Sequence, residues 1–139
     1  RYPPLVKAGA EPAALSLTTD LAPTIVELAR APAMTGIDGR SLVPLFTRPP
    51  ADWRTSFLIE YTTDIVFPRT LKMGYDAVRT ERYKFIRYRE LPGMEELYDL
   101  REDPFELSNL VRSPAAAGVL RDMETELQRI LATARPRQR

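Results

Sequence analysis

Cysteine and histidine are both missing from this 139-residue sequence. Without cysteine, the chain can form no disulfide, no thiolate metal site and no cysteine nucleophile. Without histidine, it lacks the commonest general base and the commonest zinc ligand. A glycine-rich phosphate loop, a serine nucleophile elbow and a paired-carboxylate signature are absent as well. The chain is therefore not expected to hold a complete catalytic constellation of its own.

An excess of one charge sign and long apolar runs are also lacking. Lys and Arg total 20 against 19 Asp and Glu, which gives no bulk argument for nucleic acid or an anionic membrane as a partner. No apolar run approaches the roughly 20 residues of a membrane span. The hydrophobic fraction of 44% is ordinary for a globular protein. We expect a modest folded core, with no nucleic acid and no membrane as partners; the compartment is left undetermined.

The beginning of the chain contains few regular elements. Pro3 and Pro4 exclude a helix at the start, and Leu5-Val6 could begin a short edge strand. Apolar residues at helical spacing predict a helix over 21–30. The polar triplet 18–20 just before it offers side-chain oxygens for an N-cap.

A composition change divides the sequence near its fiftieth residue. Residues 31–40 are typical of a loop, and Ser41 is a candidate cap for a short helical turn over 41–46. The stretch 48–52 is polar and proline-rich, and is the best boundary candidate. Residues 1–50 (strand, helix, loop) hold too few elements for their own core, so we expect them to be the tail of a larger domain. Residues 51–139 are expected to form a second domain.

The second half follows a different pattern. Short runs rich in aromatic and β-branched residues predict four strands, at 57–61, 75–79, 83–88 and 96–100. The short connection between the second and third predicts a hairpin. An apolar stripe at helical spacing predicts a long C-terminal helix; it comprises Leu120, Met123, Leu127, Ile130, Leu131 and Ala134. The expected fold class is α+β, a small antiparallel sheet with one face covered by that helix.

The run 82–89 alternates basic and aromatic residues and has two interpretations. Aromatics between cations on a sheet can stack bases and hold phosphates, which would make a nucleic-acid module. Alternation instead places Tyr83 and Phe85 on one face and Ile86 and Tyr88 on the other, where they would pack. The balanced charge favours packing over nucleic-acid binding.

Two groups of polar residues are candidates for binding. Four acidic residues near the C-terminal loop could suggest a cation site; they are Asp99, Glu102, Asp103 and Glu106. Their spacing does not match a calcium loop, and Asp103-Pro104 favours a tight turn instead. Glu60 ends a strand before a long loop, where a carboxylate could be a substrate ligand or an acid–base group; a solvated or ion-paired strand end is the favoured interpretation. Arg79 and Arg82 flank the hairpin turn and could meet an anionic substrate.

Four blocks, in order along the chain, resemble the sulfatase family. Residues 19–29 resemble that family's D-[LI]-x-P-T-[LI]-x-[DE]-L-A segment, and residues 36–45 its G-x-x-G-x-S-L-x-P-L stretch. Residues 77–86 resemble its A-V-R-T-x-x-[YW]-K-[YLF]-I hairpin, and residues 96–110 its L-Y-[DN]-L-x-x-D-P-x-E-x-x-N-L signature. Each block is moderately specific, and the series is strong. The residues around Trp53-Arg54 also look like the glucosamine-6-sulfatase branch.

The resemblance implies a fold and a mechanism. Sulfatases have a large α/β domain related to alkaline phosphatase, followed by a subdomain with a four-stranded antiparallel sheet and a packed helix. Residues 1–50 would end the large domain, and residues 51–139 would form the subdomain. The family's formylglycine, made from Cys or Ser in a C/S-x-P-S-R motif, and its calcium site would lie upstream, so no catalytic or metal residue is carried over. The absence of Cys and His is typical of a C-terminal portion of this family.

The resemblance also suggests indirect site residues. Loops of the family's C-terminal subdomain help to wall the substrate pocket, which by position points to Glu60, Tyr61 and the 62–74 loop, with Arg79 a weaker candidate. The partners implied are the N-terminal sulfatase domain and a sulfated small molecule or glycan. Residues 1–50 would expose apolar surface in isolation, so a homo-oligomer of the chain is a further expectation. A stand-alone binding module and a related phosphonate or phosphodiester hydrolase remain as alternatives.

Overall fold

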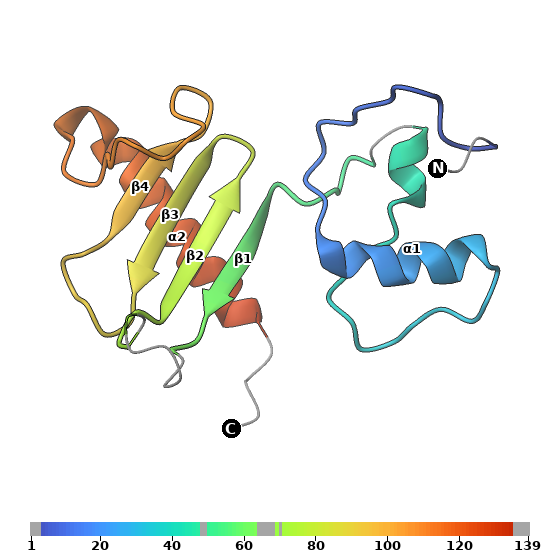
Figure 1. Cartoon of the computed structure of the whole chain (residues 1–139), viewed down its shortest axis with the longest axis horizontal. Coiled ribbons are helices and arrows are strands. Elements are labelled where there is room, and N and C mark those ends of the chain that lie inside the picture. Colours follow the sequence, from blue (N-terminus) through green and yellow to red (C-terminus); the bar gives the residue numbers. More distant parts are fainter. Residues whose placement is uncertain (1–3, 48–49, 64–68, 70, 135–139) are drawn as a thin grey trace. The chain divides into compact units, whose positions relative to one another are not determined.

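The computed structural model describes residues 4–47, 50–63, 69 and 71–134. The chain divides into two compact units, Arg1–Thr55 and Ser56–Arg139 (Figure 1). Pro3, the first two residues of the 48–52 stretch and most of the middle of the 62–74 loop lie outside the described residues. Neither α-helix of the described chain combines the length and the hydropathy that crossing a bilayer requires.

The first unit is built around one short helix. It contains the 3-10 turn η1 (Thr18–Asp20), α1 (Leu21–Leu28) and the 3-10 turn η2 (Val43–Phe46). The predicted helix over 21–30 is thereby confirmed, and it ends two residues early. Arg30 adopts a left-handed backbone conformation with φ of 53°, which cannot continue an α-helix.

Two expectations for this unit are wrong. No strand forms at Leu5-Val6, because a strand needs a hydrogen-bonded neighbour and the described part of this unit offers none. No side chain of the triplet 18–20 caps α1. The Asp20 carboxylate instead accepts hydrogen bonds from the backbone N–H groups of Leu17 (2.8 Å) and Arg40 (2.9 Å). Ser41 does help to start η2, since its Oγ accepts the N–H of Val43 at 3.2 Å.

The second unit contains a four-stranded antiparallel sheet, as predicted. The strands are β1 (Ser56–Tyr61), β2 (Tyr75–Thr80), β3 (Tyr83–Tyr88) and β4 (Glu96–Asp99), and they lie side by side in chain order. β2 and β3 form the expected hairpin, which is closed by the N–H of Tyr83 donating to Thr80 Oγ1 at 2.9 Å. Figure 1 shows the four arrows in this order, with α2 crossing behind them.

The long C-terminal helix covers one face of this sheet. It is α2 (Ala117–Thr133), which follows the 3-10 turn η4 (Pro114–Ala116). Met123 and Leu127 from the predicted apolar stripe are buried against sheet residues of β2, β3 and β4, namely Val78, Phe85 and Leu97. Leu120, Ile130 and Leu131 pack at the margin of the same cluster. The α+β class and the helix-covered sheet are confirmed.

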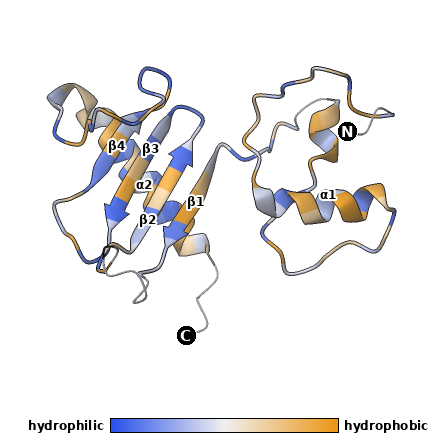
Figure 2. Ribbon diagram, viewed as in Figure 1, coloured by the Kyte–Doolittle hydropathy of each residue, from blue (hydrophilic) through white to orange (hydrophobic). Residues whose placement is uncertain are grey.

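The opposite face of the sheet, called here the open face, carries a second cluster. Ala77, Ile86 and Tyr98 form its buried centre, with Tyr75 and Tyr88 among the residues packed around it. Neighbouring Phe85 and Ile86 therefore point to opposite faces, as the alternation of the 82–89 run predicts. The alternation along the strands is visible in Figure 2 as changes between hydrophilic and hydrophobic colours.

Candidate functional site

An ion cluster lies where β1 ends and β2 begins. Glu60 and Asp76 are directly opposite each other in the strand register. Two like charges in this arrangement destabilise a sheet unless a cation lies between them. Arg89 supplies the cation: its guanidinium makes two hydrogen bonds to Asp76, with Nε 3.1 Å from Oδ2, and its Nη2 lies 3.6 Å from Glu60 Oε1. Glu60 is thus an ion-paired strand end.

Of the two carboxylates, Asp76 makes the closer contacts with Arg89. Asp76 is only 7% exposed, and burying a carboxylate without a partner costs free energy. The hydrogen bonds that Arg89 donates to Asp76 raise the pKa of Arg89 above its ordinary value, although burial of the guanidinium partly offsets this. Arg89 therefore remains a cation at neutral pH and can balance both carboxylates.

A row of tyrosines crosses the open face at the same end of the sheet. The rings of Tyr61 and Tyr75 are stacked with centroids 5.6 Å apart, and Tyr75 meets Tyr88 edge-on at 5.9 Å. The hydroxyl of Tyr88 donates to Glu96 Oε1 at 2.8 Å. Burial and this carboxylate raise the pKa of Tyr88 to about 12. Tyr88 therefore presents a neutral phenol at ordinary pH, suited to packing and hydrogen bonding.

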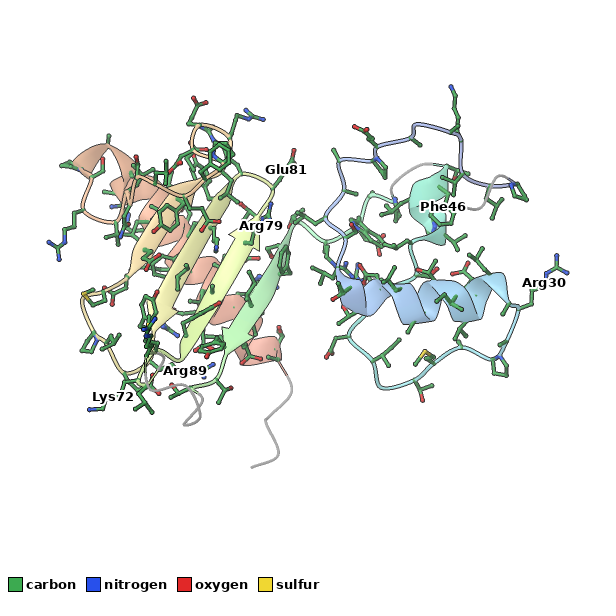
Figure 3. The ribbon with its side chains drawn as sticks, viewed as in Figure 1. Arg30, Phe46, Lys72, Arg79, Glu81 and Arg89 are labelled. Carbon is green, nitrogen blue, oxygen red and sulfur yellow. The ribbon has the colours of Figure 1, made fainter. Side chains whose placement is uncertain are left out.

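Arg79 lies apart from this end of the sheet. In the strand register it lies opposite Phe57 of β1 and opposite Lys84 of β3, and Arg79 is exposed. It shares the open face with Tyr61 but lies four residues away along the strand direction, a separation of about 13 Å. Figure 3 shows Arg79 and Arg89 at opposite ends of the sheet.

The three predicted site residues are therefore not brought together by the sheet. Glu60 and Tyr61 are adjacent in the chain, but their side chains point to opposite faces of β1. Arg79 shares a face with Tyr61 at a distance. The structure adds Arg89, which the sequence interpretation passed over even though it stands at the end of the basic-aromatic run. Its role depends on Asp76, thirteen residues earlier, and no local pattern reveals such a pairing.

The other charged candidates are bonded within the second unit. Arg82 Nη2 lies 2.7 Å from Asp99 Oδ2, and this bond lowers the pKa of Asp99. Lys84 Nζ lies 2.6 Å from Glu106 Oε2. Two cations of the 82–89 run are thus paired with acidic residues, one at the end of β4 and one in the loop that follows it, which supports the packing interpretation of that run.

The acidic set does not converge on a point. Besides the pairings of Asp99 and Glu106, the Asp103 carboxylate accepts the N–H of Ser108 at 2.8 Å. This bond and the backbone bond from Glu106 N–H to Asp103 O, at 3.2 Å, make the predicted tight turn. Within the described ranges, no group of three or more potential metal-binding side chains is found.

The first unit contains a buried ion pair that the sequence interpretation missed. Asp20 is fully buried and forms a two-pronged ion pair with Arg54, whose Nη2 lies 2.8 Å from Asp20 Oδ1. Burial alone would raise the pKa of Asp20, but the hydrogen bonds from Arg54 and from the N–H groups of Arg40 and Leu17 hold it below its ordinary value. Trp53 beside it donates its Nε1–H to Leu15 O at 2.8 Å. The Trp53-Arg54 dipeptide therefore ties residues 51–55 to the first unit.

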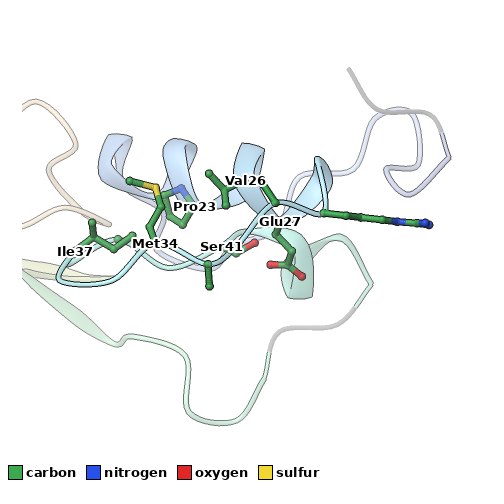
Figure 4. Close-up of a pocket in the computed structure, with 10 residues that line it drawn as sticks. Pro23, Val26, Glu27, Met34, Ile37 and Ser41 are labelled. Carbon is green, nitrogen blue, oxygen red and sulfur yellow. The ribbon is translucent and has the colours of Figure 1, made fainter.

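A cavity of about 540 Å³ lies in the first unit between α1 and the loop that follows it (Figure 4). Its lining is largely apolar and includes Pro23, Val26, Met34 and Ile37, with Glu27 as a carboxylate. Arg30, two residues after α1, also lines the pocket, and Figure 3 shows its side chain pointing away from the helix. This combination offers no set of converging cations for a sulfate group.

Comparisons with known proteins agree with the geometry of both units. The family model described as N-sulphoglucosamine sulphohydrolase, C-terminal, matches residues 1–133. An N-acetylglucosamine-6-O-sulfatase of Bacteroides thetaiotaomicron is 33% identical over 113 residues, which is 79% of this chain and 20% of that protein.

Solved structures show the same similarity. A protein in complex with its substrate D-glucosamine-2-N,6-O-disulfate superposes with a TM-score of 0.82 at 29% identity, covering 93% of this chain and 26% of the other. The phosphonate monoester hydrolase of Agrobacterium radiobacter superposes with a TM-score of 0.66 at 27% identity, covering 82% and 24%. The chain thus spans only about a fifth to a quarter of the length of these relatives.

Proposed function

The chain belongs to the sulfatase family and corresponds to its C-terminal domain, and from this membership we propose that it is part of an active sulfuric ester hydrolase. The observation that carries the proposal is the match of the family model to nearly the whole chain, residues 1–133. The role of this part is to complete the fold and to wall the substrate pocket. Bond cleavage would belong to residues upstream of Arg1.

The division of labour follows from the side chains present. The sequence has no Cys that could become formylglycine and no His, and the ionisable groups at the sheet end are engaged in the Arg89 cluster. Formylglycine and calcium, which the family resemblance implies for the upstream part, would supply the nucleophile and the positive charge that sulfate ester hydrolysis needs. What this chain contributes is shape and specificity.

The two units would belong to different parts of the whole enzyme. We assign the first unit to the end of the large α/β domain and the second to the C-terminal subdomain. In support, α1 leaves Leu21 55% and Ile25 65% exposed, and a helix that is apolar on several sides is typically buried in a larger protein. The second unit has its own core under α2 and needs no such cover on that side.

The substrate class would be a sulfated amino sugar. The solved relative with the higher TM-score of the two above binds a glucosamine disulfate, and the curated relative is an N-acetylglucosamine-6-O-sulfatase. Tyr61 and the adjoining 62–74 loop would contact the sugar, and Glu60 would border the same region. Arg79, exposed and about 13 Å from Tyr61 along the strand, would meet a second anionic group of a longer glycan.

A second candidate is a phosphonate or phosphodiester hydrolase of the same superfamily. It is favoured by the similarity to the phosphonate monoester hydrolase, at a lower TM-score of 0.66 against 0.82.

One assay separates the two candidates. The full-length protein, matured so that formylglycine can form and supplied with calcium, is incubated with glucosamine 6-sulfate and with a phenyl phosphonate monoester at equal concentration. We expect inorganic sulfate to be released with the higher kcat/KM. A higher kcat/KM for the phosphonate would favour the second candidate, and no turnover of either would reject both.

A further inference from the structure

Arg89 contacts the chain on both sides of the 62–74 loop. Its Nη1–H donates to the backbone carbonyl of Tyr61, the residue before the loop, at 3.4 Å. Its own backbone N–H donates to the carbonyl of Gly74, the last loop residue, at 2.8 Å. Its guanidinium also binds Asp76, the second residue of β2. A single residue, directly after the end of β3, thus joins the two ends of the loop.

The two loop ends are also bonded to each other. The N–H of Gly74 donates to Thr63 Oγ1 at 3.0 Å. Gly74 is buried, and a Cβ at this position would lie 3.1 Å from both Thr63 Oγ1 and Glu90 Oε2. The close approach of the two ends therefore leaves little room for a side chain here. This base of the loop is a defined structure and not a loose connection.

The same contacts fix Tyr61 from two directions. Arg89 holds the backbone of Tyr61 and pairs with the neighbouring Glu60 on one face of β1. On the open face, the Tyr61 ring is stacked against Tyr75. The end of β1 thus contacts the charged cluster on one face of the sheet and the aromatic row on the other.

We infer that Arg89 is a positioning residue for substrate specificity, which holds Tyr61 and the base of the 62–74 loop in the arrangement that recognises the sugar. This inference rests on the proposed function for the role of Tyr61. Arg89 would act through Tyr61 and the loop base, because its guanidinium is engaged with Asp76, Glu60 and Tyr61 O. Its removal should weaken recognition of the sugar while leaving the reacting groups in place.

Two variants of the full-length protein test this. Arg89→Met removes the charge, and Arg89→Lys retains one cation for Asp76 but cannot form the fork that also reaches Tyr61 O. For glucosamine 6-sulfate, we expect each variant to raise KM roughly tenfold with little change in kcat, the scale of one lost pocket contact. For 4-nitrophenyl sulfate, whose flat ring does not need the sugar contacts, KM should stay within about twofold of wild type.

Arg82→Lys is the matched control. It alters the same kind of guanidinium–carboxylate pair, with Asp99, near the other end of the same strands. It should leave the KM values of both substrates unchanged. Equal KM changes for Arg89→Lys and Arg82→Lys, or equal losses on both substrates for Arg89→Lys, would overturn the inference.

A second readout does not depend on turnover. Hydrogen exchange at the backbone N–H of Gly74, whose bond to Thr63 closes the loop base, should become faster in Arg89→Lys and stay at the wild-type rate in Arg82→Lys. Unchanged exchange in Arg89→Lys would reject the positioning role of Arg89 even if the enzyme is active. Faster exchange in a protein that cleaves no sulfate ester would reject the proposed function and retain that role at the loop base.

Discussion

At the scale of single residues, the Asp20–Arg54 pair is the main electrostatic feature of the first unit. The two residues are 34 positions apart, Asp20 is fully buried, and the Arg54 side chain is 9% exposed. Removing one partner of such a pair leaves a buried charge without compensation, which is far more costly than the net value of the pair.

We therefore expect Arg54→Met to destabilise the first unit by about 3–5 kcal/mol. The single tryptophan, Trp53, lies next to the pair and reports its unfolding by fluorescence during a urea titration. Lys7→Met is the control: it removes a cation from an exposed position and should change stability by less than about 0.5 kcal/mol. Similar unfolding midpoints for the two variants would show that the pair is not structural.

The same carboxylate predicts how the first unit responds to acid. Burial favours the neutral form of Asp20, but the bonds from Arg54, Arg40 and Leu17 outweigh it and lower the pKa. Its stabilising contribution is thus complete above the unfolded-state pKa, about 3.9, and is lost as the pH falls through the lower folded-state value. The free energy of unfolding, measured by Trp53 fluorescence, should therefore fall more steeply over this pH window for wild type than for Asp20→Asn. Parallel curves would contradict the assignment.

Gly39 makes a second residue-scale prediction. A Cβ on Gly39 would lie 2.0 Å from the carbonyl oxygen of Thr19, a distance that only a backbone shift could relieve. Gly39→Ala should therefore lower the free energy of unfolding of the first unit by roughly 1–3 kcal/mol, as at other overpacked sites. Gly9→Ala is the comparison, because a Cβ there would meet nothing within 4 Å. Its φ of 74° adds backbone strain but no steric clash. A smaller effect at Gly39 than at Gly9 would contradict the predicted clash.

At the scale of elements, α2 and the sheet stabilise each other through Leu127. This side chain has 0% exposure and packs in the cluster with Phe85 and Leu97. Leu127→Ala should destabilise the second unit by about 2–5 kcal/mol, the range for truncating a buried leucine. Hydrogen exchange of β3 amides measures this, and Glu124→Ala, at an exposed position of the same helix, should have little effect. Equal protection in both variants would mean that α2 does not support the sheet.

Elements with strong periodicity could be predicted from the sequence. The four strands and the helix-covered face were predictable because alternation along β3 and the stripe on α2 are local patterns. The role of Asp20 was not, because its partner Arg54 is distant and capping was the nearest local use for an aspartate. Arg89 was missed for the same reason, since its partners belong to other strands.

The candidate site was predictable only as a region. Position in the family's order pointed to the end of β1, where Glu60 and Tyr61 lie, but not to the faces of their side chains. The strand register then separates Arg79 from Tyr61. β1 and β2 are joined by the long 62–74 loop and not by a tight turn, so no turn type fixes their register in advance.

At the scale of the whole molecule, the exposed apolar surface of α1 predicts self-association of the isolated chain. Leu21 and Ile25 lie one helical turn apart and are both more than half exposed. Static light scattering at micromolar concentration should give a mass above the 15.8 kDa of the monomer. The variant Leu21→Glu/Ile25→Glu should shift the mass toward the monomer, because charges on the patch oppose its burial.

Gln128→Glu is the control for this measurement. It adds negative charge at an exposed position of α2, away from the patch, and should leave the mass unchanged. A clean monomer for the wild-type chain would contradict the view that the first unit is part of a larger domain.

The central claim is that this chain is the C-terminal part of a sulfatase. The most direct test is to sequence the coding region immediately upstream of Arg1. We expect an open reading frame that continues upstream for about three times the length of this chain, in line with the 20% and 26% coverage of its relatives, and that contains a C/S-x-P-S-R motif with acidic metal-binding clusters. An initiator methionine directly before Arg1 would contradict it and would leave a non-catalytic module in place of a hydrolase.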